Sequence, residues 1–149
     1  MIIARLAGGL GNQMFQYAFA RALAKHHNVP FGLDLSFFRD NPVSSPRFTA
    51  REYELGKVFG IEKEISREEV DALAMMAMKK TPDSPYRLLR EGHAGVDMGL
   101  FDLGPNMVFE GYFQSERYFE TAASAVREDF TFAVPPTAPA PAIRERIRG

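Results

Sequence analysis

The sequence predicts an α/β fold with a Rossmann-like parallel sheet and flanking helices. An apolar run at residues 1–6 stops at a glycine cluster, and a helical pattern begins directly after it. Two further apolar runs, at 29–35 and 107–113, read as buried strands, and a helical pattern follows the second one. Strands that alternate with helices are typical of a parallel sheet. The 149 residues suffice for a single core.

The first helix is expected to continue from Met14 to His26 or His27, because apolar residues recur on one broad face. Residues 36–50 contain two prolines and three serines with little periodicity, and we expect a loop there. A short helix is predicted over 52–58, where glycines limit its length.

Ser66 and Glu69 have the spacing of a capping box and predict a helix through Ala77. Glycines interrupt residues 83–104, so no long element is expected there. Residues 130–132 are predicted to form a last short strand. The methionines of the predicted helix are expected in a core or an interface: Met75, Met76 and Met78.

The turn after the first strand has the composition of an anion site. Gly8, Gly9 and Gly11 lack the Cβ atoms that would block a phosphate, and a helix N-terminus leaves backbone N–H groups without partners. Asn12 and Gln13 add neutral amide groups at the mouth of the turn. The pattern therefore predicts a diphosphate or sugar-nucleotide site, and the alternative is a tight βα turn without a ligand.

Two better-known glycine-rich loops fit this turn less well. A P-loop requires a lysine after its last glycine, and the first lysine of this chain is Lys25. The dinucleotide fingerprint matches at Gly9 and Gly11, but its third position is Met14, which is too bulky for close packing of helix on strand.

Polar residues at other predicted strand ends are further candidates. Gln114 and Ser115 follow the strand at 107–113, and strand ends of an open α/β sheet converge on one crevice, so we expect both near Asn12. Ser115 is also expected to cap the next helix, and Tyr112 to be an ordinary core aromatic. Asp34 stands where a dinucleotide-binding fold places its ribose-binding acid, although an aspartate also ends strands.

Arg51 and His93 are two further candidates for a role in a site. Arg51 is a planar donor that suits a phosphate, and a structural salt bridge is its alternative. His93 lies near glycines and has no acid at a telling spacing, so we expect an exposed loop histidine there rather than a general base.

Three stretches of the chain together form a recognisable pattern. Residues 51–61 contain an Arg-x-Tyr-x-Leu segment, and 110–119 contain a Gly-Tyr-aromatic-Gln-Ser block. The first stretch is Gly8-Gly9-Leu10-Gly11-Asn12-Gln13-Met14-Phe15-Gln16-Tyr17-Ala18. All three resemble motifs of the α-1,2-fucosyltransferases, glycosyltransferase family 11, and they occur in that family's order over nearly the whole chain.

This resemblance implies the N-terminal half of a GT-B-like two-domain enzyme. Such an enzyme moves fucose from GDP-fucose to the 2-hydroxyl of a galactose-terminated acceptor glycan with inversion. It implies no metal and no cofactor, and it leaves the catalytic residue unassigned. The residues expected to bind substrate are Gly9, Gly11, Asn12, Gln13, Gln114 and Ser115.

The chain departs from the family in one respect. Members carry a His-x-Arg-x-x-Asp block at the start of the second half, whose arginine is understood to neutralise charge on the departing GDP, and none of the three histidines here begins that pattern. We therefore expect a Rossmann-like domain over 1–133, then a proline-rich linker and the start of an interdomain helix over 134–149. The C-terminal nucleotide-sugar domain is expected on a missing segment or a second chain.

Three functions remain open on these grounds. The first is a fucosyltransferase N-terminal half, inactive alone. The second is a non-catalytic module that binds a nucleotide or phosphosugar. The third is an NAD-type oxidoreductase domain that uses Asp34.

Composition excludes several other classes. The net charge is −1 and the basic residues are dispersed, so nucleic acid is not an expected partner. Cysteine is absent, which excludes disulfides and thiolate chemistry. No apolar run has membrane-spanning length and no secretory signal is recognised. We expect a cytoplasmic protein, with peripheral association at the inner membrane face left open.

Overall fold

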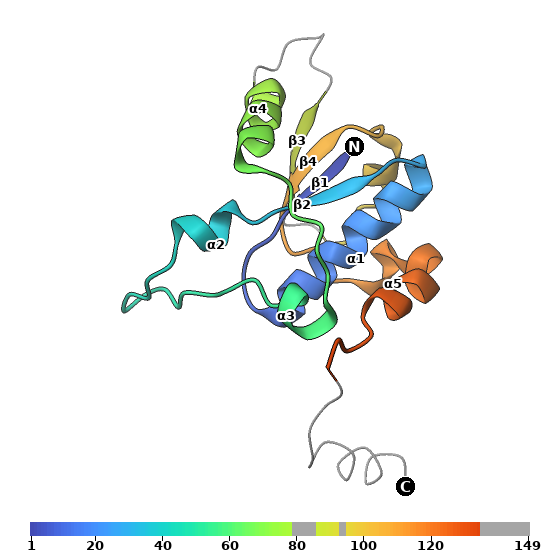
Figure 1. Ribbon diagram of the computed structural model, residues 1–149. Helices are drawn as coiled ribbons and strands as arrows, with labels where there is room; N and C mark the ends of the chain where they lie inside the picture. The colour runs from blue at the N-terminus through green and yellow to red at the C-terminus, as the bar shows by residue number, and fades with distance from the viewer. Residues whose placement is uncertain (79–85, 93–94, 135–149) are drawn as a thin grey trace, which may run out of the picture.

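The computed structural model describes residues 1–78, 86–92 and 95–134. Its centre is a parallel sheet of four strands in the order β2-β1-β4-β3 (Figure 1). The four strands end at the same level, because residue 5 at the end of β1 pairs with residues 34 and 110, and residue 90 pairs with residue 110. The strands are β1 (Ile2–Arg5), β2 (Phe31–Asp34), β3 (Arg87–Arg90) and β4 (Met107–Glu110).

Helices cover both faces of this sheet. The helix α1 (Leu10–His27) packs on one face against β1 and β2. On the same side it contacts α3 (Leu55–Phe59) and the 3-10 turns η2 (Glu116–Tyr118) and η3 (Glu120–Ala122), which lead into α5 (Ala123–Asp129). The helix α4 (Arg67–Met78) covers β3 and β4 on the other face. Two smaller elements are α2 (Ser36–Asp40) and the 3-10 helix η1 (Met98–Asp102).

The alternation of side chains in β1 produces these two layers. Ile2 and Ala4 face the larger core under α1, whereas Ile3 joins Leu73 of α4 in a smaller cluster. At the centre of the larger core Phe19 of α1 stacks on Phe113, with ring centroids 4.2 Å apart. This buried packing holds α1 against the sheet and against the turn that follows β4.

The predicted fold class is confirmed, and so are the first three elements and the capping box. Glu69 N donates to Ser66 Oγ at 3.2 Å, as the capping-box spacing predicted. The strand β3 was not predicted, because glycines interrupt residues 83–104 and no long element was expected there. The strand expected over 107–113 ends earlier than predicted, at Glu110, because Gly111 turns the chain at φ +150°.

Several local predictions are wrong. Residues 36–40 form α2 rather than loop. The helix expected over 52–58 begins only at Leu55. The side chain of Gln13 binds the backbone carbonyl of Glu52 and the backbone N–H of Glu54, and it holds these two residues outside the helix. The helix expected after Ser115 is divided by Phe119, whose ψ of 17° and φ of −128° leave the helical region.

Other predictions concern burial. Met75 and Met76 are 61% and 41% exposed, so neither lies in the core. The expectation that Tyr112 is a core aromatic is wrong: it is 43% exposed, and its neighbour Phe113 occupies the core instead. Residues 130–132 form no strand, and Ala133 N instead donates to Val58 O. The proposed linker and helix beyond residue 134, the end of α4 beyond residue 78 and His93 lie outside the described residues.

Within the described ranges, no helix combines the length and the apolar character that crossing a bilayer requires.

Candidate functional site

The β1–α1 turn presents open backbone donors. Gly9 is the N-cap of α1 and supplies no side-chain cap, and the first turn contains no acid. The first backbone bond of the helix runs from Gln13 N to Gly9 O at 3.1 Å. Among described residues, no acceptor contacts the N–H groups of residues 10–12. The turn thus has the free donors and the positive helix-dipole end that an anion requires.

The glycines of this turn have different roles. Gly8 has φ +79°, and a Cβ atom there would collide with the side chain of Asn12. A Cβ atom on Gly11 would meet nothing within 4 Å, so Gly11 opens space in front of the helix rather than relieving a contact. Gly8 is therefore required by the backbone of the turn, and Gly11 leaves open space in front of it.

Asn12 and Gln114 come together as the strand-end argument predicted. Gln114 Nε2 donates to Asn12 Oδ1 at 2.6 Å, and Gln114 is exposed while Asn12 is half-buried. This contact leaves the Asn12 amide nitrogen on the same side as the open turn, since a Cβ atom on Gly8 would approach it. Two of the predicted substrate-binding residues thus share one surface.

Gln13 has a structural position instead. Its side chain is 0% exposed; Nε2 donates to Gly8 O at 3.0 Å and Glu52 O at 2.8 Å, and Oε1 accepts from Glu54 N at 2.9 Å. These bonds use the amide to hold the loop before α3 against the turn. We therefore leave Gln13 out of the proposed binding surface.

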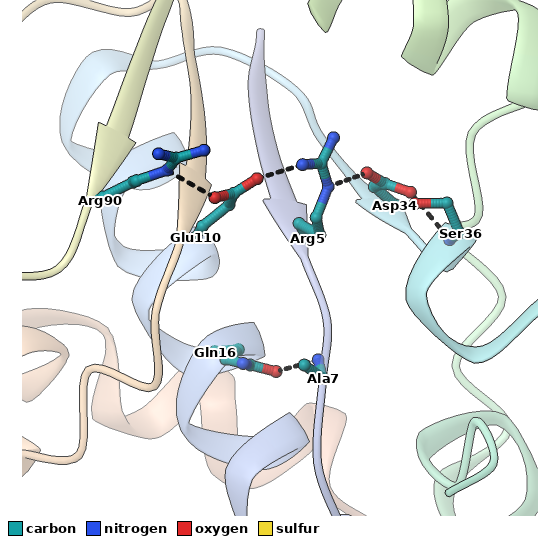
Figure 2. A network of polar contacts seen from close by, with 7 residues as sticks. All are labelled: Arg5, Ala7, Gln16, Asp34, Ser36, Arg90 and Glu110. Carbon is teal, nitrogen blue, oxygen red and sulfur yellow. Dashed lines mark hydrogen bonds and ion pairs between the residues drawn. The ribbon is translucent and has the colours of Figure 1, made fainter. Parts of the chain in front are cut away.

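Gln16 is a residue that the sequence analysis did not single out. It is 1% exposed, accepts from Ala7 N at 3.0 Å and donates to Gly111 O at 2.9 Å (Figure 2 shows the first bond). Its amide therefore joins the turn after β1 to the turn after β4. The helical period was a usable signal, because residues 13, 16, 17 and 20 lie on the buried face of α1.

Arg51 lies beside the open turn. A Cβ atom built on Gly9 would be 3.8 Å from Arg51 Nη1, and the arginine is exposed. The expected structural salt bridge is absent, since Arg51 has no ion pair or hydrogen bond with any described residue. An uncompensated guanidinium at the N-terminus of α1 adds to the positive potential of the turn.

The turn after β4 already contains an anionic partner. The Glu91 carboxylate accepts from Tyr112 N at 2.7 Å and from Phe113 N at 2.9 Å. Ser115 Oγ accepts from Arg117 N at 3.4 Å, so the predicted cap is confirmed, although it caps a 3-10 turn. The backbone donors at residues 112 and 113 are thus occupied by the protein itself.

Alternating charges line the carboxyl edge of the sheet (Figure 2). Arg5 Nε donates to Asp34 Oδ2 at 2.6 Å and Arg5 Nη1 binds Glu110, while Arg90 Nε donates to Glu110 Oε2 at 2.9 Å. Burial acts to lower the pKa of Arg5, but the hydrogen bonds and charges of Asp34 and Glu110 outweigh burial and raise the pKa. We call Asp34, Arg5, Glu110 and Arg90 the charge row.

The charge row argues against a ribose-binding role for Asp34. Its carboxylate is 0% exposed, one oxygen is bound by Arg5, and the other accepts from Ser36 N at 2.8 Å. A ribose hydroxyl would have to displace these partners. The NAD-type alternative therefore loses the residue on which it depended.

No metal centre is formed by clustered histidine and carboxylate side chains in the part of the chain that the structure describes.

One curated protein shares this sequence pattern over most of the chain. An α-1,2-colitosyltransferase of Escherichia coli is 28% identical over 146 residues, which cover 88% of this chain and 45% of that protein. The likeness supports a glycosyltransferase family. The chain spans about half of the relative, so the activity of a whole enzyme goes beyond what the match covers. No protein-family model matches the chain. No solved structure matches it either.

Proposed function

We propose that this chain is the N-terminal half of an inverting glycosyltransferase that moves fucose from GDP-fucose to the 2-hydroxyl of a galactose-terminated glycan. The observation that carries the proposal is the β1–α1 turn, where open N–H groups, Asn12 and Arg51, which has no ion-pair partner among the described residues, lie together without an acid in the first helical turn. The motif that forms this turn is also one of the two stretches, with 110–119, whose resemblance to the family is specific.

The chemistry of the proposed reaction explains why such a turn would matter. Departure of a sugar from a nucleoside diphosphate builds negative charge on the phosphate, and preorganised donors stabilise that charge. The turn offers backbone dipoles and Arg51 offers a full positive charge. Of the two interpretations of Arg51 that the sequence left open, its position beside Gly9 supports the phosphate-binding one.

The rest of the cleft would come from a second half. The resembling family supplies its leaving-group arginine there, and this chain matches 45% of the colitosyltransferase. The chain alone is therefore expected to bind GDP without transferring sugar, and a non-catalytic nucleotide or phosphosugar module remains the alternative. Activity after addition of a second half would separate the two.

Binding of GDP is the first test. Titration of the 149-residue chain with GDP, followed by ¹H–¹⁵N NMR, is expected to shift the amide signals of residues 10–12. Arg51→Ala is expected to weaken binding about tenfold, equivalent to about 1.4 kcal/mol. Arg47→Ala is the matched control, because Arg47 is also exposed and has no partner among described residues. Shifts confined to other regions, or equal losses in both variants, would reject the site.

The transferred sugar needs a second test, because the name of the relative favours a second candidate, transfer of colitose. A chimera joining this chain to the C-terminal part of the colitosyltransferase would be given GDP-fucose or GDP-colitose with a galactoside acceptor. Faster transfer from GDP-fucose supports the proposal and faster transfer from GDP-colitose supports the second candidate. Absence of transfer from either, by a folded chimera, favours the non-catalytic module.

A further inference from the structure

A groove separate from the α1 N-terminus lies where β1 and β4 end. Its volume is about 640 Å³, and its lining includes Arg5, Phe37, Arg90, Glu110, Gly111 and Tyr112. In the strand order β2-β1-β4-β3, β1 and β4 are neighbours although they lie far apart in the sequence, so the groove is formed by two distant segments of the chain. Ligands of open α/β sheets bind outside the carboxyl ends of the strands.

The charges of the groove are balanced. Its lining contains two arginines, Arg5 and Arg90, and two glutamates, Glu91 and Glu110. The ion pairs of Glu110 with Arg5 and Arg90 neutralise most of this charge. A phosphate would gain little attraction here and would face two carboxylates, whereas the β1–α1 turn has Arg51 and no acid in its first helical turn. The two neighbouring sites therefore differ in the charge of the ligand that they suit.

The groove also combines donors, acceptors and an aromatic ring. The side chain of Arg90 is 72% exposed and uses its Nε for Glu110, so its terminal N–H groups face solvent. Glu110 is 25% exposed and can accept further hydrogen bonds. Tyr112 is 43% exposed, and its backbone N–H donates to the Glu91 carboxylate, which fixes the backbone that carries the ring. Aromatic surface with a few fixed polar groups suits a ligand with apolar faces and many hydroxyls.

We propose that this groove is the subsite for the neutral sugar acceptor, with Tyr112 as the aromatic platform and Arg90 and Glu110 as hydrogen-bonding partners of its hydroxyls. The inference rests on the proposed function for the identity of the saccharide. Gln16 supports the placement, because its amide joins Ala7 at the edge of the first turn to Gly111 at the edge of the groove. The acceptor would thus lie next to the sugar whose diphosphate occupies the first turn.

The test uses lactose as a neutral, galactose-terminated probe and GDP as an anionic one, each titrated into the full 149-residue chain and followed by ¹H–¹⁵N NMR. Lactose is expected to shift the amide signals of residues 90–92 and 110–112, and GDP those of residues 10–12. Tyr112→Ala is expected to weaken lactose binding about tenfold and leave GDP binding unchanged. Tyr112→Phe keeps the ring and is expected to retain lactose binding.

Phe132→Ala is the matched control, because Phe132 is 48% exposed and does not line the groove. Equal weakening in the Tyr112→Ala and Phe132→Ala variants overturns the inference, and so does a shift of groove signals by GDP rather than lactose. If lactose leaves the amide signals of the groove unchanged while GDP still shifts those of residues 10–12, the saccharide subsite is rejected and the proposed donor site is not. Lactose binding in the groove without any GDP binding supports the saccharide subsite and counts against the proposed donor site.

Discussion

The turns after β1 and β4 lie at the ends of paired strands, yet they use their backbone N–H groups differently. After β4, the Glu91 carboxylate binds the N–H groups of Tyr112 and Phe113. After β1, the N–H groups of residues 10–12 have no acceptor within the described residues. One turn carries an anion of its own, and the other is left open for one.

This difference shows that glycine content alone does not define an anion site. Both turns contain a glycine with positive φ, Gly8 at +79° and Gly111 at +150°. What separates them is a carboxylate delivered by a neighbouring strand end, since Glu91 directly follows β3. Within the described part of the chain, the open turn is recognised by the lack of such an internal partner and by Arg51, which forms no ion pair there.

The largest effect is expected at Gly111. A Cβ atom there would collide with Glu91, and the φ of +150° is unfavourable for other residues, so Gly111→Ala should lower the free energy of unfolding by about 4 kcal/mol. Gly104→Ala isolates the strain, because Gly104 has φ +93° and open space around it; we expect a loss of about 1 kcal/mol. Urea denaturation measures both. Equal losses would mean that contact with Glu91 does not hold the turn.

Gln16→Leu tests the bridge between the two turns. It leaves Ala7 N and Gly111 O, on two half-buried residues, without their partner, and the two unsatisfied groups should lower the free energy of unfolding by about 3 kcal/mol. Gln114→Leu, at an exposed amide in the same region, should change it by about 0.5 kcal/mol or less. If urea denaturation gives similar values, the buried amide is not what couples the turns.

Tyr53→Phe tests the loop that supports the open turn. Tyr53 Oη donates to Ile61 O at 2.7 Å, and losing this bond should cost about 1 kcal/mol of unfolding free energy at pH 7. Burial, with smaller contributions from Glu64 and Glu62, raises the pKa of Tyr53 from 10.0 to about 12.

The raised pKa gives this variant a pH signature. The folded state holds the phenol proton more tightly than the unfolded chain, so this contribution to stability is complete below pH 10 and declines as pH rises towards 12. Tyr17 is also buried with a raised pKa and titrates in both proteins, so the variant difference isolates Tyr53. The unfolding free energies of the unchanged protein and of the Tyr53→Phe variant, measured at pH 7, 10 and 11, should converge as the pH rises. A constant difference would contradict the assignment.

Gly11→Ala is the mildest change and has the opposite sign. No atom lies within 4 Å of a Cβ atom at this position in α1, so the variant should be more stable by about 0.5 kcal/mol, because alanine favours a helix. Thermal unfolding measures the gain. A loss of stability would show that the space in front of the open turn is needed by the fold itself.

Much of the fold could be predicted because its signals are local. The long apolar face of α1 and the buried run of β1 specify their own structure. The strand β3 could not be predicted, because its sequence Arg-Leu-Leu-Arg is short and polar at both ends, and it becomes a strand only by pairing with β4. The helix period also distinguishes buried Gln13 and Gln16 from accessible Asn12.

The candidate site was predictable only where it depends on strand ends. The meeting of Asn12 and Gln114 follows from parallel topology, since both follow the ends of paired strands. The position of Arg51 depends on how the segment after α2 returns to the glycine turn, and no local pattern specifies that path. The carboxylate of Glu91 was missed for the same reason, because its role needs β3 beside β4.

The charge row also limits how this protein can diverge. Asp34, Arg5, Glu110 and Arg90 alternate in sign across neighbouring strands, and Asp34 is fully enclosed. A mutation that reverses one member places like charges side by side, so inheritance of a single reversal is disfavoured until a neighbour changes as well. In homologous proteins these positions are therefore expected to change in pairs. Such covariation would trace the ancestry of this edge of the sheet better than its glycines do.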